Sequence, residues 1–210
     1  MDEKLKSKIM GRIMGTQREG VDRLAKFLLY DSDYFSAPAS SKYHSNYDGG
    51  LARHSDNLVE MLLQSNKRCR LGLTEATIYL AGYLHDLCKV NIYKKTMRKR
   101  MNPVTGNWEA YGTYEINDKF PLGHGEKSLV LALRFIQLTD EECLMIRWHM
   151  GSMLPVEDQK TLAAAQDKYP AVRAINLADI EASKFLEKVI PPRVYTIDQY
   201  NKFMRGEFSI

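Results

Sequence analysis

The sequence LHDLCK at residues 84–89 contains an adjacent histidine and aspartate, His85 and Asp86, followed closely by Lys89. The chain has only five histidines, and four of them fall in segments whose apolar spacing predicts helix. Successive members of this pattern are separated by roughly one helical hairpin of sequence, and the pattern closes on an aspartate of a later helix. The remaining members are His54, His124, His149 and Asp179. This order predicts a metal-binding cage inside a helical bundle.

The overall composition is that of a globular protein. With 210 residues, 44% of them hydrophobic, the chain can bury one sizeable core and does not require two domains. No apolar run approaches the length of a membrane span, and the charged start Met1-Asp2-Glu3-Lys4 is unlike a signal peptide. A cytoplasmic protein without a membrane partner is therefore expected. The net charge of +4 is mild and does not by itself imply a nucleic-acid partner.

The three cysteines are an odd number, and no two of them form a Cys-x-x-Cys pair. This spacing argues against a disulfide framework and against a thiolate zinc site. We expect Cys69, Cys88 and Cys143 to be buried apolar residues.

The element pattern predicts an all-α bundle with one β-hairpin inserted in it. Thr74 is a plausible N-cap for the helix that leads into His85-Asp86, and Thr139 with Glu142 predicts a capping box for the helix of His149. Pro170 can open the helix of Asp179. The predicted organisation is a single domain, 1–210. Its parts are N-terminal helices at 1–30, a basic β-hairpin at 91–118 between the His85-Asp86 helix and the His124 helix, and a C-terminal tail at 189–210.

Imidazoles and carboxylates are ligands for divalent metals of the first transition series and for zinc. Six such groups exceed the need of one cation, so two divalent ions are expected, drawn from Mn, Fe, Ni, Co, Zn or Mg. A carboxylate that bridged them would hold them about 3.5–4 Å apart, as in paired-metal hydrolysis, and Asp86 is the candidate bridge. The first ion would take His54, His85, Asp86 and Asp179. The second would take Asp86, His124 and His149.

Two lysines follow predicted ligands at helical spacing. Lys89 lies three residues after Asp86, and Lys127 lies three residues after His124, so each ammonium can share a helical face with a ligand. A fixed cation beside the metals could hold a phosphate oxygen. Asp86 and Lys89 are therefore the predicted catalytic residues, and Lys89 and Lys127 are predicted substrate contacts. Lys89 as an ordinary cation at a helix C-terminus is the alternative.

At these residues the sequence resembles the HD superfamily of metal-dependent phosphohydrolases. The motifs that carry the resemblance are GGLARH at 49–54, LHDLCK at 84–89, Gly123-His124, Trp148-His149 and Leu177-Ala178-Asp179. The presence of both His124 and His149 is similar to the branch with two metals. The resemblance implies an all-helical core and metal-dependent hydrolysis of phosphate esters or anhydrides, often in nucleotides. One departure is Cys88, where the family frequently has glycine; it removes no ligand.

The run YHSNYDGGL at 43–51 resembles the segment before the first ligand in the HD domain of bacterial 3′-5′ exoribonucleases. Those proteins carry an additional nucleic-acid-binding domain, and no counterpart of it is expected in this sequence. The resemblance places His44 in a substrate pocket, and a role in packing the loop is the alternative.

The predicted hairpin is rich in cations and aromatic rings. Its first arm carries Arg98 among four other cations, and its second arm carries Trp108, Tyr111 and Tyr114. Such a surface could bind phosphates and stack bases, which makes Arg98 a predicted substrate contact. A solvated edge strand protected by lysine and arginine is the alternative.

The sequence therefore predicts a metal-dependent phosphohydrolase that cleaves a phosphate ester or anhydride through a metal-activated water. The expected partner is a phosphorylated small molecule, a nucleotide or a single-stranded nucleic acid. Two alternatives remain open, an HD-type di-iron oxygenase and a nucleic-acid-binding module with structural metals. Nothing in the sequence indicates the oligomeric state.

Overall fold

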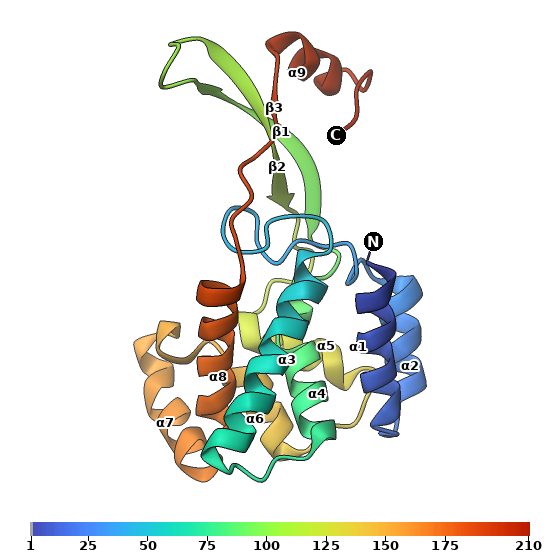
Figure 1. Ribbon diagram of the computed structural model, residues 1–210, viewed down its shortest axis with the longest axis vertical. Coiled ribbons are helices and arrows are strands. Elements are labelled where there is room, and N and C mark those ends of the chain that lie inside the picture. Colours follow the sequence, from blue (N-terminus) through green and yellow to red (C-terminus); the bar gives the residue numbers. More distant parts are fainter. Residues whose placement is uncertain (1) are drawn as a thin grey trace.

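The computed structural model describes residues 2–210 and shows a helical body with a small antiparallel sheet standing on one end (Figure 1). The helices are α1 (Glu3–Gly15), α2 (Val21–Lys26), α3 (Gly50–Cys69), α4 (Glu75–Leu84), α5 (His124–Leu133), α6 (Asp140–Trp148), α7 (Gln159–Lys168), α8 (Ala171–Glu181) and α9 (Ile197–Met204). The strands are β1 (Tyr93–Met101), β2 (Trp108–Ile116) and β3 (Val194–Tyr195). The predicted helical fold with a hairpin is thus confirmed at this level.

Helix α3 lies at the centre of the body, against α4 and α8. Its buried face includes Leu51, Leu58 and Leu62, each fully shielded from solvent. These leucines recur at helical spacing, so burying one face of α3 removes a continuous apolar stripe from water. The same helix carries His54 in its second turn, which fixes one predicted ligand to the best-packed element of the fold.

Two helix starts follow the predicted capping chemistry. The Thr74 side chain accepts from the Thr77 amide at the start of α4. At α6, the Thr139 hydroxyl and the Glu142 carboxylate each accept from the other residue's backbone N–H, which is a complete capping box.

Helix α4 ends earlier than predicted. His85 is its C-cap, Asp86 leaves helical geometry with φ −106° and ψ 22°, and Leu87–Lys89 forms a short 3₁₀ turn. The His85 imidazole bonds the Gly82 carbonyl, one of the carbonyls that a helix end leaves without an intrahelical partner. Lys89 therefore reaches the predicted site from a tight turn, not from a continuous helical face.

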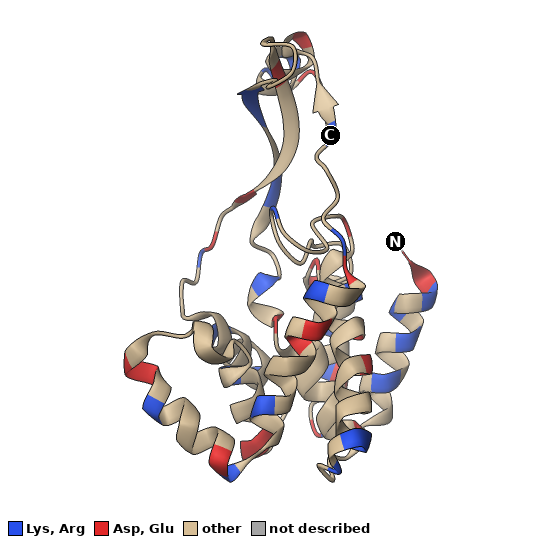
Figure 2. Ribbon diagram, turned by 60° about the vertical axis from the view of Figure 1, so that its left-hand side comes forward, with Lys and Arg blue, Asp and Glu red and all other residues tan. Residues whose placement is uncertain are grey.

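The predicted hairpin is present, with β1 and β2 in register from Tyr93↔Ile116 to Met101↔Trp108. The Asn102 side chain accepts from the amides of Val104 and Thr105 and so orders the turn. Lys and Arg colour one arm of the hairpin blue in Figure 2; these cations belong to β1.

The C-terminal residues are not the tail that the sequence pattern predicted. Beyond Pro191-Pro192 the chain forms β3, which pairs with β2 through Ala110↔Tyr195, and then α9. Tyr195, Met97 and Ala110 are the buried residues of a second small core, and Phe203 of α9 packs against it. An apolar face on α9 and an apolar patch on the hairpin therefore cover each other.

The cysteines only partly match the expectation of burial. Cys88 is buried, Cys143 is half-buried, and Cys69 is exposed at the end of α3. The described helices include none with the length and hydropathy of a membrane span.

Candidate metal centre

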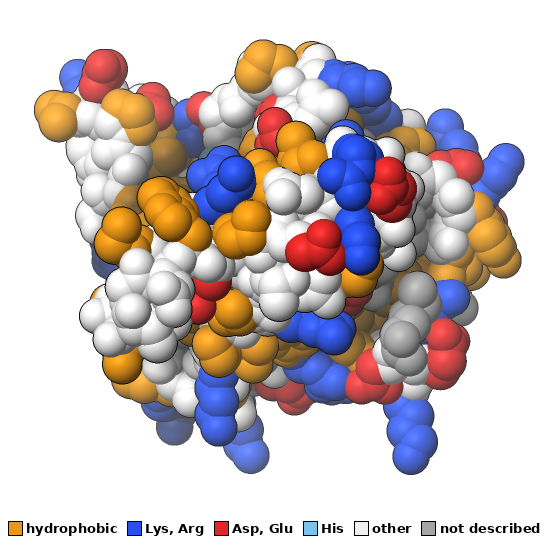
Figure 3. Space-filling model, turned by 90° about the horizontal axis from the view of Figure 1, so that it is seen from above, with side chains coloured by type: hydrophobic (Ala, Val, Ile, Leu, Met, Phe, Trp, Pro, Cys, Tyr) orange, Lys and Arg blue, Asp and Glu red, His pale blue; other side chains and the backbone are white. Residues whose placement is uncertain are grey.

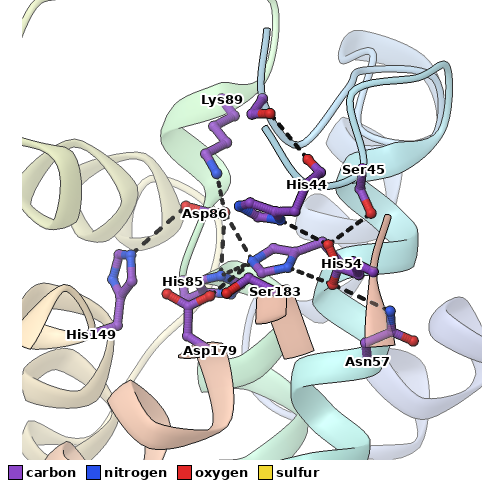
Figure 4. Close-up of polar contacts among 12 residues, drawn as sticks. His44, Ser45, His54, Asn57, His85, Asp86, Lys89, His149, Asp179 and Ser183 are labelled. Carbon is purple, nitrogen blue, oxygen red and sulfur yellow. Dashed lines mark hydrogen bonds and ion pairs between the residues drawn. The ribbon is translucent and has the colours of Figure 1, made fainter. Parts of the chain in front are cut away.

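The six predicted ligands come together at one end of the helical body, although they belong to five different helices or helix ends. In Figure 4 the labelled ligands His54, His85, Asp86, His149 and Asp179 point toward a common region. The elements that supply the six are α3 for His54, the end of α4 for His85 and Asp86, the first residue of α5 for His124, the C-cap of α6 for His149, and α8 for Asp179.

Asp86 lies between two groups of imidazoles. Its Oδ2 is 3.4 Å from Nε2 of His54 and 3.3 Å from Nε2 of His85. Its Oδ1 is 2.7 Å from Nε2 of His124 and 3.8 Å from Nε2 of His149. The two carboxylate oxygens therefore face different sets of nitrogen ligands, as a bridging carboxylate must.

Backbone carbonyls orient two of the imidazoles so that their Nε2 atoms face the cluster. Nδ1 of His85 donates to the Gly82 carbonyl at 2.8 Å, and Nδ1 of His149 donates to the Ile146 carbonyl at 2.7 Å. Because Nδ1 carries the proton in each ring, Nε2 presents a lone pair to the cluster. Nε2 of His149 is buried and has no hydrogen-bond partner among residues 2–210. A buried acceptor without a partner is costly, and a bound cation would satisfy it, so the residues present fit a metal.

The charges in the cluster also favour a cation. Burial, together with the neighbouring His85, lowers the pKa of His149 to about 3, so this ring is neutral. Burial also disfavours a charged His54, but hydrogen bonds to Asp179 and Glu187 outweigh it and raise the pKa of His54 to about 9. Burial would raise the pKa of Asp179, yet the contact with His54 holds it below its usual range. The buried carboxylates thus stabilise positive charge in this region.

The ligand atoms form three sets in which all members lie within 4.8 Å of one another. Two match the predicted division, with His54, His85 and Asp86 in one and Asp86, His124 and His149 in the other. The third joins His85, His149 and Asp179. His149 therefore lies within reach of both groups, and the division between two ions is less sharp than the sequence pattern implied.

Glu187 contacts the cluster and was not predicted from the sequence. Its Oε1 accepts from Nδ1 of His54 at 2.9 Å, and its Oε2 accepts from Nδ1 of His44 at 2.8 Å and from the Ser45 hydroxyl at 2.7 Å. Burial would raise the pKa of Glu187, but the bonds from His44 and His54 hold it below its usual range. In the neutral ring that a metal ligand requires, this carboxylate would keep the proton of His54 on Nδ1 and leave Nε2, which lies near Asp86, for the metal.

Two glycines allow the loop that carries His44 to approach α3. Gly49 has φ +84°, in the left-handed region that favours glycine. A Cβ on Gly50 would collide with the Ser45 carbonyl oxygen. The Gly-Gly pair at the start of α3 is therefore required for the contact between the loop and the Glu187 carboxylate.

The predicted substrate-binding cations have different surroundings. Nζ of Lys89 lies 2.6 Å from Oδ2 of Asp86, and although burial disfavours its charge, Asp86 raises its pKa. Lys127 is buried, and its ammonium pairs with Asp118 at 2.6 Å, so this charge is already balanced. Arg98 is exposed on β1, opposite Tyr111. Of the three, only Lys89 contacts a predicted ligand.

Cys88 lies beside the ligand from α5. Its backbone N–H donates to the Ser128 hydroxyl at 3.0 Å, and its sulfur is 3.5 Å from Nδ1 of His124. The departure from glycine at this position therefore leaves the approach of α5 intact and adds a thiol contact to His124.

Comparison with known proteins gives a partial match. The chain is 31% identical over 90 residues to the 3′-5′ exoribonuclease YhaM of Geobacillus sp. (strain WCH70). The match covers 42% of this chain and 28% of that protein, so the chain spans well under two thirds of its relative. No family model and no solved structure matches the chain. The similarity weakly supports the resemblance to the HD superfamily, and the buried His/Asp cluster could hold metal ions.

Proposed function

We propose that this protein is a metal-dependent phosphohydrolase that cleaves a phosphate ester or anhydride in a nucleotide or a short nucleic acid. The observation that carries the proposal is the position of Asp86, whose two oxygens face separate pairs of imidazoles while Lys89 contacts the same carboxylate. Paired divalent ions, when bound, polarise a phosphoryl oxygen and lower the pKa of a bound water. The two metal sets share Asp86, in accord with this chemistry.

The protein's own residues orient the reacting groups. His54, His85 and His149 keep their Nε2 atoms in the cluster through the hydrogen bonds that their Nδ1 atoms donate. Lys89 provides a fixed ammonium beside Asp86 that can hold a phosphate oxygen and balance charge that develops on it. Its side chain is 13% exposed, so little water competes for it.

His44 is the proposed substrate contact on the opposite side of His54. The centroids of the two rings are 4.7 Å apart, and the side chain of His44 remains 23% exposed. Glu187 binds both rings, which gives His44 a defined orientation at the margin of the site. In the alternative interpretation from the sequence, the contact of His44 with Glu187 only packs the loop, and His44 binds no substrate.

The proposed substrate class follows from the relative's name, since that protein is an exoribonuclease. The test is hydrolysis of a panel of nucleotides and oligonucleotides by protein supplied with divalent metals. Asp86→Ala should abolish turnover, and Asp167→Ala, on the exposed surface of α7, should not change it. Full turnover by Asp86→Ala would refute the proposed site. Substrate-dependent oxygen consumption with iron, without phosphate release, would favour the oxygenase alternative.

A further inference from the structure

A cleft of about 740 Å³ lies outside the metal cluster. Its walls are the loop around Tyr47, the hairpin strands β1 and β2, and the segment that leads into β3. Cations in its lining are Lys42, Lys95, Arg100 and Arg193. The volume falls within the range of ligand sites in proteins, roughly 300–1,000 Å³.

The cleft combines positive charge with aromatic rings. The guanidinium of Arg100 lies 5.0 Å from the centroid of the Tyr111 ring, and that of Arg193 lies 5.3 Å from the centroid of the Tyr195 ring. Tyr111 also lines the cleft and is half-buried, so part of its ring remains accessible. Viewed from the hairpin end, Lys and Arg side chains lie among hydrophobic ones (Figure 3).

The charge of the cleft is only partly balanced. Asp48 pairs with Lys95 at 2.6 Å and accepts from the Tyr114 hydroxyl at 2.8 Å. Among residues 2–210, neither Lys42 nor Arg193 has a carboxylate within ion-pair distance. Arg100 pairs with Glu109 at 2.7 Å, so Lys42 and Arg193 are the cations of the lining that no described carboxylate balances. Cations near aromatic rings are complementary to a phosphate backbone with unstacked bases.

The floor of the cleft consists of Asn46, Tyr47 and the segment around Ile190. It adjoins the residues that hold Glu187 beside the metal centre. Within the loop, His44 and Ser45 bond to Glu187, whereas the neighbouring Asn46 and Tyr47 line the cleft. The segment after Glu187 lines the cleft through Ile190 and the residues that follow it.

The two segments of this floor are joined by backbone and side-chain hydrogen bonds. The Asn46 amide donates to the Ile190 carbonyl at 2.9 Å, and the Ile190 N–H donates to the Asn46 side-chain oxygen at 2.7 Å. The Ser45 N–H donates to the Lys188 carbonyl. These hydrogen bonds hold the two segments together beside Glu187, so the fold itself forms this part of the cleft.

We infer that this cleft binds a segment of single-stranded nucleic acid and holds it next to the metal centre. The inference rests on the proposed function for the chemistry at the reacting end of the strand. The positive charge and the aromatic rings of the cleft are what favour a polymer over a single nucleotide. In a duplex the bases stack on each other, so they are not free to stack on the tyrosines of the cleft. A mononucleotide offers too few phosphates for cations spread from Lys42 to Arg193.

The test is fluorescence anisotropy with a labelled, nuclease-resistant phosphorothioate strand of about 12 nucleotides, within the span of known single-strand sites. The protein is used as purified, without a chelator, and ribose and deoxyribose strands, a duplex and a mononucleotide are compared. Lys42→Glu with Arg193→Glu should weaken strand binding by at least about tenfold and reduce the salt dependence. The matched control reverses Lys160 and Lys168, two exposed lysines of α7, and should bind as the parent does.

Circular dichroism of each double variant shows whether it keeps the parent's fold, and Tyr111→Ala provides a second variant without a charge change. It should weaken strand binding by about 1–3 kcal/mol per stacked base, or roughly 5- to 150-fold. Equal losses in the α7 control, or unchanged binding in both cleft variants, would refute the cleft as the site. Tighter binding of the duplex or the mononucleotide would also refute the inference. Nucleotide hydrolysis without strand binding would overturn the inference alone and leave the proposed function standing.

Discussion

Oε1 of Glu187 lies 2.9 Å from Nδ1 of His54, although 133 residues separate the two in the sequence. When His54 is neutral, as a metal ligand must be, this contact would keep its proton on Nδ1 from outside the predicted ligand set. Loss of an outer carboxylate of this kind typically lowers metal affinity by about 10- to 100-fold. We expect Glu187→Ala to show a loss of this size in competition titrations with a metal-binding dye. Glu187→Gln should lose less, because its amide oxygen can still accept from Nδ1.

The matched control for Glu187 is Glu181→Gln at the end of α8, whose carboxylate lies 3.9 Å from Arg68 and is partly exposed. It should retain the parent's metal affinity. If Glu187→Ala bound metal as tightly as Glu181→Gln does, the orienting role of Glu187 would be wrong.

His149 distinguishes a two-metal site from a one-metal site. Its Nε2 lies 3.8 Å from Oδ1 of Asp86 and has no hydrogen-bond partner in the described structure. If two ions bind, His149→Ala should reduce the metal content from about two to about one per chain, because His54, His85 and Asp179 remain to hold the other. Elemental analysis after dialysis measures the content. An unchanged content in this variant, or a parent that never exceeds one ion, would exclude the paired site.

The clustering of the six predicted ligands could be inferred from the sequence because each lies on or beside a helix whose ends are encoded locally. Thr74 and Thr139 mark the starts of α4 and α6 by their own side chains, and the histidines follow at the ends of those helices. The adjacent pair His85-Asp86 then indicated which side chains belong together. Local capping and helical periodicity therefore carried most of the information about the site.

Glu187 and the C-terminal sheet could not be predicted in the same way. Glu187 follows the π-helical turn after α8 and has no periodic relation to any ligand, so only the fold brings it to His54. Pairing of β3 with β2 joins residues far apart in the chain. One local signal was present, since Thr196 with Gln199 forms a capping box that predicts α9. The Pro191-Pro192 pair that precedes it was interpreted as the end of the globular fold, so the residues beyond it were predicted to be a tail.

Lys89 tests the phosphate hypothesis separately from metal binding. Its ammonium is held 2.6 Å from Oδ2 of Asp86, and a fixed charge beside a transferring phosphoryl group contributes to the transition state. We expect Lys89→Met to lower kcat by about 10²- to 10³-fold while the metal content stays at the parent's value. Lys89→Arg should recover part of the rate, since it restores the charge. A large loss of metal in Lys89→Met would instead assign Lys89 a structural role.

The stability of the fold should depend on pH through Glu142, away from the metal cluster. This buried carboxylate accepts two bonds from Arg18, at 2.7 Å and 2.8 Å. Burial would raise the pKa of Glu142, but the Arg18 guanidinium outweighs it and holds the pKa below the usual range. A depressed folded-state pKa stabilises the protein above the unfolded-state pKa of about 4.3, and this contribution is lost as the pH falls through the folded-state value.

Glu142→Gln removes this charge and should lower the free energy of unfolding by roughly 1.5–3 kcal/mol at pH 7. The difference from the parent should shrink as the pH falls below about 4, because the unfolded parent then takes up a proton that the folded carboxylate, with its lowered pKa, does not. Urea unfolding at pH 7, 5 and 3.5 measures both effects. Glu157→Gln, at an exposed position before α7, is the matched control and should follow the parent at every pH. A deficit in Glu142→Gln that stayed constant down to pH 3.5 would show that packing, and not the ion pair with Arg18, is what the substitution removes.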